Sequence, residues 1–189
     1  MKFKTTFIAL SVSATLFSGM AGAAITGTSS VQMDFQTKVV SGTCTAKVLN
    51  GAGAVSTEIA FGDVYKSDLV NKTRVEPLKI SFTNCSGVEK ATVSVASVAG
   101  PKQSCSGANG TGGSFAGGLT TGFEIWSGAV DTGLLMHCYN IPAPQEVTIT
   151  DGAGEFPMNS RIVIAEGRDI SQVGTGAVNA ALTFTVAYQ

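Results

Sequence analysis

The sequence predicts an all-β protein, an antiparallel sandwich or barrel built from several short strands. Apolar residues alternate with polar ones in run after run, and no stretch carries a helical stripe. Clusters of Gly, Asn, Asp and Ser, such as Asn50-Gly51 and Asp151-Gly152, separate the alternating runs. Short strands with frequent turns between them are typical of sandwiches and barrels.

The alternating runs predict the strands in order along the chain. The residues expected to face inward are Leu78, Ile80 and Phe82; Val93 and Val95; Phe123 and Ile125; Val147 and Ile149; Ile162 and Ile164; and finally Ala180, Leu182, Phe184, Val186 and Tyr188. The final run is the longest and most regular of these. Residues 104–118 are rich in glycine and are expected to form a surface loop.

The composition suits one folded domain and excludes two classes of protein. The chain has 189 residues, of which 44% are hydrophobic and 13% are charged, so it can bury a core and is not disordered. The formal net charge is −1, which provides no basic field to attract nucleic acid.

The first 23 residues have the three parts of a secretory signal peptide. Lys2 and Lys4 form a positive start, residues 7–17 form an apolar run, and Ala21-Gly22-Ala23 forms a small-residue cleavage site. The apolar run is shorter than the ~20 residues that a membrane-spanning helix needs. The sequence therefore predicts an exported chain whose mature form begins at Ala24.

Export changes the meaning of the four cysteines. In an oxidising compartment an even number of cysteines predicts disulfides, and four cysteines allow three pairings. A metal site is not expected, because no two cysteines stand at C-x-x-C spacing and His137 is the only histidine. His137 has apolar neighbours and is interpreted as structural, so the chain lacks a nucleophile–base set. We therefore expect neither an enzyme nor a bound cofactor.

Three segments of the mature chain resemble the subunits of chaperone–usher pili of the type 1 and P pilus kind. Residues 35–44 have an aromatic residue, a valine pair and a first cysteine at the pilin spacing, although Thr37 stands where pilins commonly have glycine. Residues 79–85 resemble the strand that carries the second pilin cysteine. The chain ends in an alternating strand with a penultimate Tyr188 and with Gly176 fourteenth from the end, as pilins do.

The resemblance implies an immunoglobulin-like sandwich, residues 35–189, that lacks its last strand. A periplasmic chaperone would lend a strand to the resulting groove, beside the C-terminal segment. At the outer-membrane usher, the N-terminal arm of the next subunit would replace it. The residues implied on this chain's arm, residues 24–34, are Ile25, Gly27, Ser29, Val31 and Met33; those implied along the groove are Gly176, Ala180, Leu182, Phe184, Val186 and Tyr188.

The resemblance also implies one disulfide and a function. It pairs Cys44 with Cys85, which leaves Cys105 with Cys138, a second bridge that is not a general pilin feature. The expected function is a shaft or minor subunit of a fimbria that supports adhesion at the cell surface. The alternative is a secreted sugar-binding sandwich or an adhesin tip. Tip adhesins of this family carry an additional lectin domain and no arm, so the subunit is favoured.

Overall fold

The computed structural model describes residues 36–38, 40–99 and 104–189. The predicted signal peptide, residues 1–23, and the predicted arm, residues 24–34, lie outside these residues. The chain divides into Met1–Lys38 and a compact unit, Val39–Gln189, which holds all the described helices and strands.

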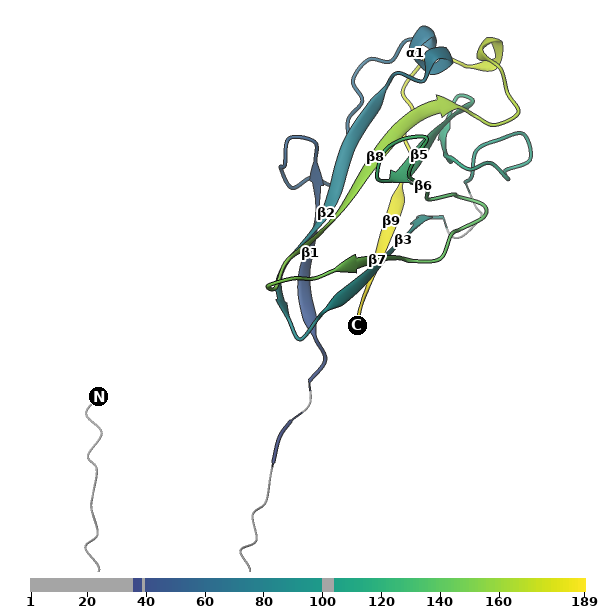
Figure 1. The fold of residues 1–189 in the computed structure, drawn as a ribbon. Coiled ribbons are helices and arrows are strands. Elements are labelled where there is room, and N and C mark those ends of the chain that lie inside the picture. The colour runs from purple at the N-terminus through teal and green to yellow at the C-terminus, as the bar shows by residue number, and fades with distance from the viewer. Residues whose placement is uncertain (1–35, 39, 100–103) are drawn as a thin grey trace, which may run out of the picture. The chain divides into compact units, whose positions relative to one another are not determined.

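The compact unit contains two antiparallel sheets that pack face to face (Figure 1). The first sheet is formed, in order, by β1 (Thr43–Asn50), β2 (Val75–Ser86), β8 (Gly154–Ile164), β5 (Thr121–Ser127) and β4 (Phe115–Gly118), and β6 (Leu134–Leu135) also pairs with β5. The second is formed by β7 (Gln145–Thr148), β3 (Lys90–Ser97) and β9 (Leu182–Tyr188). The prediction of an all-β antiparallel fold is therefore confirmed.

The core lies between the sheets and follows the predicted alternation. On β2, Leu78, Ile80 and Phe82 are buried, while the residues between them are more exposed. On β3, Val93 and Val95 are buried in the same cluster. Successive side chains of a strand point to opposite faces, so the alternation in the sequence translates directly into one buried face.

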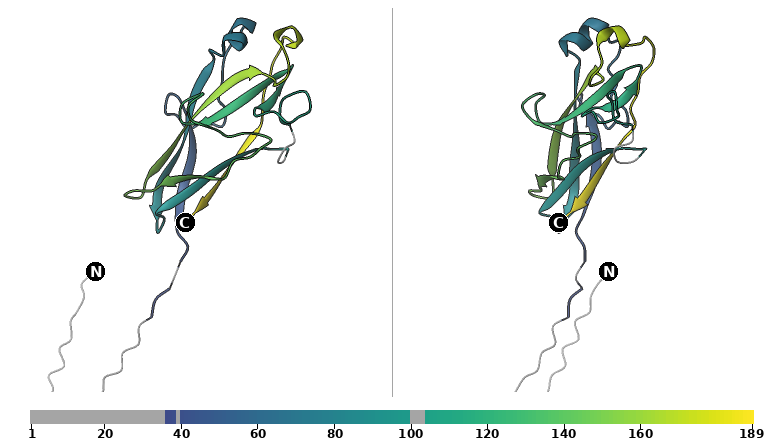
Figure 2. Two further views of the ribbon diagram at one scale, coloured as in Figure 1. Left: turned by 45° about the vertical axis from the view of Figure 1, so that its right-hand side comes forward. Right: turned by 90° about the vertical axis from the view of Figure 1, so that its right-hand side faces the viewer.

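Two short helices were not predicted from the sequence. The helix α1 (Lys66–Asn71) buries only Leu69, and the 3₁₀ helix η1 (Ile170–Gln172) has three residues. Elements this short produce no helical stripe. Leu69 packs in a second cluster with Ile162 and Val173. This contact fixes α1 beside the C-terminal end of strand β8. Both helices lie at the same end of the domain (Figures 1 and 2).

Residues 104–118 are not the surface loop that their glycines suggested. Cys105, Ser106 and Phe115 are buried, and the last four residues form β4. The backbone amides of Ser106 and Ala116 donate to the carbonyl oxygens of Ser114 and Ser104, at 2.8 and 2.7 Å. A side chain at Gly112 would lie 2.6 Å from the Ser106 carbonyl oxygen, so its glycine permits close backbone packing rather than exposure.

Both disulfides have the pairing that was expected. Cys44 on β1 is bonded to Cys85 on β2, and Cys105 is bonded to Cys138. The two bridges have different roles in the fold. The first joins an edge strand to its neighbour, whereas the second holds the buried segment 104–106 along β4.

Removing the two bridges is expected to have different consequences. Both close loops of similar size, with sequence separations of 41 and 33, worth about 4 kcal/mol each in the chain-entropy model. Replacing Cys44 and Cys85 with alanine frees an edge strand of the sandwich, so the yield of folded subunit should fall sharply. Replacing Cys105 and Cys138 should be milder and should mainly expose residues 104–114 to protease.

Limited proteolysis of the two double variants, with mass spectrometry of the fragments, distinguishes these outcomes. Fragments that start within residues 104–114 are expected only for the Cys105→Ala/Cys138→Ala variant. Equal yields for both variants, with the same cleavage sites, would contradict the assigned roles.

Candidate functional site at the open edge of β9

The last strand, β9, is paired along one edge only. It runs antiparallel to β3, with Val186 opposite Val93 and Phe184 opposite Val95. In the described part of the chain, no strand pairs with its other edge. An unpaired edge presents a row of free backbone N–H and C=O groups and is a template for another strand.

The hydrogen-bond pattern shows which residues of β9 present these groups. Gln189 and Lys90 exchange two bonds: the Gln189 amide donates to the Lys90 carbonyl at 2.9 Å, and the Lys90 amide donates back at 3.4 Å. Such pairs alternate along an antiparallel ladder. The backbone groups of Tyr188 and of every second residue before it, back to Leu182, therefore point to the open side.

The side chains of these same residues are only partly covered. Leu182, Phe184, Val186 and Tyr188 are half-buried and pack against the main core. Their partners across the ladder on β3 are fully enclosed: Val93 is 0% exposed and Val95 is 2% exposed. The residues of β9 are therefore part of the core on one side and lack a neighbour on the other.

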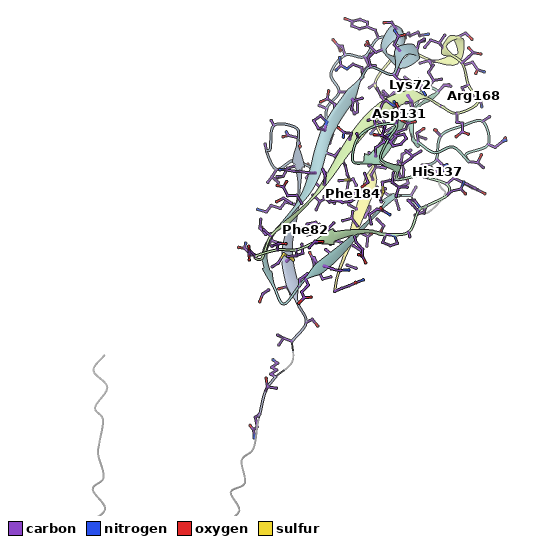
Figure 3. All side chains as sticks on the ribbon, in the orientation of Figure 1. Lys72, Phe82, Asp131, His137, Arg168 and Phe184 are labelled. Carbon is purple, nitrogen blue, oxygen red and sulfur yellow. A yellow bond between two sulfur atoms is a disulfide. The ribbon has the colours of Figure 1, made fainter. Side chains whose placement is uncertain are left out.

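Strand β1 provides the opposite side of this row. Cys44 and Val48 of β1 are also half-buried against the main core. The Tyr188 hydroxyl donates to the Cys44 carbonyl oxygen at 3.3 Å, which joins the end of β9 to the start of β1. We call Cys44, Val48, Leu182, Phe184, Val186 and Tyr188 the apolar row. Figure 3 labels Phe184 on β9 and the core residue Phe82 on β2.

The structure brings most of the predicted groove residues together. Four of the six lie on β9 itself. Ala180 lies two residues before the strand but is half-buried against the same core. Gly176 lies in the irregular segment before β9 with φ 140°, a conformation that favours glycine. Val48 was missed, although Cys44, Ala46 and Val48 alternate with Thr43, Thr45 and Lys47 and this pattern could have identified it.

Most other sheet edges in the described residues are shortened or partly covered. The segment 104–106 pairs along β4, and the Ser56 amide donates to the Val48 carbonyl oxygen at 3.1 Å near the end of β1. Strand β7 has four residues and follows Pro142 and Pro144. Proteins commonly protect their edge strands in these ways. The seven-residue edge of β9 is left open in comparison.

The strongest electrostatic cluster lies elsewhere and is structural. The buried Arg161 donates to Glu124 at 2.8 Å and to both carboxylate oxygens of Asp131 at 2.7 and 2.8 Å. The hydrogen bonds from Arg161 hold the pKa of Asp131 below its ordinary value, and Asp131 in turn raises the pKa of Arg161. This cluster fastens the turn that contains Asp131 onto the outside of β5 and β8.

The described residues offer little for chemistry. His137 accepts a hydrogen bond at Nδ1 from the Asn140 amide at 3.0 Å, which fits its expected structural role. Among them no group of three or more His, Cys, Asp or Glu side chains could hold a metal ion. Within the same residues, no helix has the length and apolar character to cross a membrane. The Arg161 cluster and His137 both have structural roles within the domain, whereas the open edge of β9 has none.

Known proteins resemble this chain in fold and in sequence. The fold matches the P pilus rod subunit PapA with a TM-score of 0.51 and 16% identity, over 77% of this chain and 99% of that one. It matches a chaperone–usher pilus structure with a TM-score of 0.52 and 18% identity, over 89% and 100%. In sequence, the chain is 34% identical to the fimbrial-like protein YadL of Escherichia coli strain K12, over 100% of this chain and 99% of that protein.

The chain belongs to the family of fimbrial-like proteins, and it has the fold of chaperone–usher pilus subunits. No family model matches the sequence, so the assignment rests on the relative and on the shared fold. It confirms the immunoglobulin-like pilin fold and the export of the subunit to the cell surface in fimbriae. Of the proteins that it resembles, one is a pilus rod subunit and another is a fimbrial-like protein.

Proposed function

We propose that this pilus subunit is a structural component of a fimbria, shaft or minor, that polymerises when a strand from another chain pairs with the open edge of β9. The observation that carries the proposal is the apolar row, in which the half-buried side chains of β9 coincide with the free backbone groups of its open edge. A strand added there would complete the second sheet and cover the row. The subunit would thereby support bacterial adhesion as a part of the fimbria.

The arm of a neighbouring copy has the length and pattern to fill this place. Residues 24–34, extended at ~3.4 Å per residue, reach roughly 37 Å. The seven residues of β9 span roughly 24 Å at the same rise. Ile25, Gly27, Ser29, Val31 and Met33 would face the core, and backbone bonds would supply most of the affinity.

In a filament whose copies all point the same way, the arm can run in only one direction along β9. Strand β9 runs away from the α1 end of the domain, whereas β1 begins at the opposite end (Figure 1). An arm that runs antiparallel to β9 leaves its host at the α1 end and continues into the start of β1 of its own domain. Repetition of this contact gives an open head-to-tail polymer rather than a closed ring.

A free edge of this kind needs protection before assembly. We propose that a periplasmic chaperone lends a strand to β9 after export, and that an outer-membrane usher is the place where the next arm replaces it. Without such a partner, the apolar row would favour aggregation through the edge.

The test introduces an aspartate on each face of the arm in turn. Val31→Asp should block insertion into a neighbour, because an unpaired carboxylate would enter an apolar site, yet should leave chaperone binding intact. Ser30→Asp is the matched control and should polymerise, because residue 30 would face solvent. Polymer ladders on gels report insertion, and co-purification reports chaperone binding. Normal ladders from Val31→Asp would refute the proposed role of the arm.

A further inference from the structure

An exposed apolar face lies at the α1 end of the domain. Leu69 anchors the helix in the second core cluster, and this leaves Tyr65 and Val70 69% and 56% exposed. Lys66 stands four residues before Val70, so the two side chains share one face of the helix. Lys66 is exposed and forms no ion pair in the described residues. We call Tyr65, Lys66 and Val70 the α1 face.

A hollow of about 560 Å³ lies at the opposite end of the domain. Val88 and Ile149 line it, and both are 8% exposed. The acidic side chains Glu89 and Asp151 also line it and have no ion-pair partner among the described residues. Lys90, the basic residue of the lining, is instead paired with Glu146 at 3.1 Å. The hollow is therefore lined by both apolar and polar groups and has two unpaired acids.

The start of β1 ties this hollow to the proposed assembly. A side chain at Gly42 would lie 2.2 Å from the Gly87 carbonyl oxygen and 2.7 Å from Val88. The backbone that enters β1 therefore runs directly against the lining of the hollow. An arm that leaves its host at the α1 end would bring the hollow of its own domain toward that end.

We propose that the α1 face of one copy docks into the hollow of the next copy along the polymer. Tyr65 and Val70 would contact Val88 and Ile149, and the Lys66 ammonium would pair with the two acids. The inference rests on the proposed strand exchange, which brings the two ends together. The contact is small, so strand exchange supplies the affinity, and the docked ends set the angle between consecutive copies and the rate of their encounter.

Charge reversal at each end separates this contact from strand exchange. Lys66→Glu alone places a carboxylate opposite the two acids of the next copy. Glu89→Lys/Asp151→Lys alone places two ammonium groups opposite Lys66. Both variants replace attraction with repulsion. Each change is at an exposed side chain. The triple variant restores attraction with the signs exchanged. Polymerisation of purified chaperone–subunit complexes is followed by gel ladders and electron microscopy at low salt and again at about 1 M salt, where charges are screened.

We expect assembly at low salt to slow by about tenfold for each end alone, and to recover in the triple variant. At high salt the differences should disappear. Tyr65→Ser/Val70→Ser should slow assembly at both salt concentrations, because it removes apolar contact. Wild-type rates for all these variants would overturn the docking contact and leave strand exchange standing. Failure of the wild-type chain to polymerise at all would instead overturn the proposed function, and the docking contact with it.

Discussion

Changing Phe184 to aspartate is expected to abolish capture of the subunit by its chaperone. Phe184 is at the centre of the apolar row and is half-buried against the main core before any partner strand arrives. Aspartate removes this packing and places an unpaired carboxylate where the added strand would bury it. A loss of about 4 kcal/mol lowers affinity about a thousandfold. The uncaptured subunit should then be degraded in the periplasm.

Thr185→Asp is the matched control for this variant. Thr185 is the next residue on the same strand, but it is exposed on the outer face of the sheet. The Thr185→Asp variant introduces the same charge outside the apolar row, so capture should remain at the wild-type level. Co-purification with the chaperone and pulse–chase half-life measure the two effects. Equal capture of Phe184→Asp and Thr185→Asp would show that the chaperone binds elsewhere.

Residues 35–189, produced with both disulfides but without arm or chaperone, are expected not to form a stable monomer. The open edge leaves the side chains of β9 uncovered on one side, and the isolated domain should aggregate or unfold readily. A synthetic peptide of residues 24–34 should restore a soluble folded domain. At a peptide concentration of about 1,000 times its Kd, binding adds about 4 kcal/mol of stability.

The same peptide with Val31→Asp is the control and should restore little. Urea unfolding followed by circular dichroism, with and without peptide, measures the effect. A soluble monomer of ordinary stability, about 5–15 kcal/mol without peptide, would refute the strand-deficient interpretation. A secreted binding module would then be the better hypothesis for this chain.

The class of the fold and much of the candidate site could be predicted from the sequence. Alternation of period two is a local property, so it marked Leu78 to Phe82 on β2 and Leu182 to Tyr188 on β9 correctly. The pilin-like cysteine segments indicated the pairing of Cys44 with Cys85, which the structure contains. The final strand was identified as the groove strand because its motif at the end of the chain resembles the pilin motif.

Which strand edges are free and which are covered became known from the three-dimensional arrangement of the strands. Strand pairing joins residues far apart in the chain, such as Ile80 with Phe156, and local alternation carries no information about it. The glycine-rich segment 104–118 proved partly buried because a disulfide holds it to Cys138 and its two halves pair with each other. Val48 joined the apolar row because β1 lies across from β9. The free edge of β9 follows from the absence of a neighbour among the described strands, which is a property of the assembled sheet.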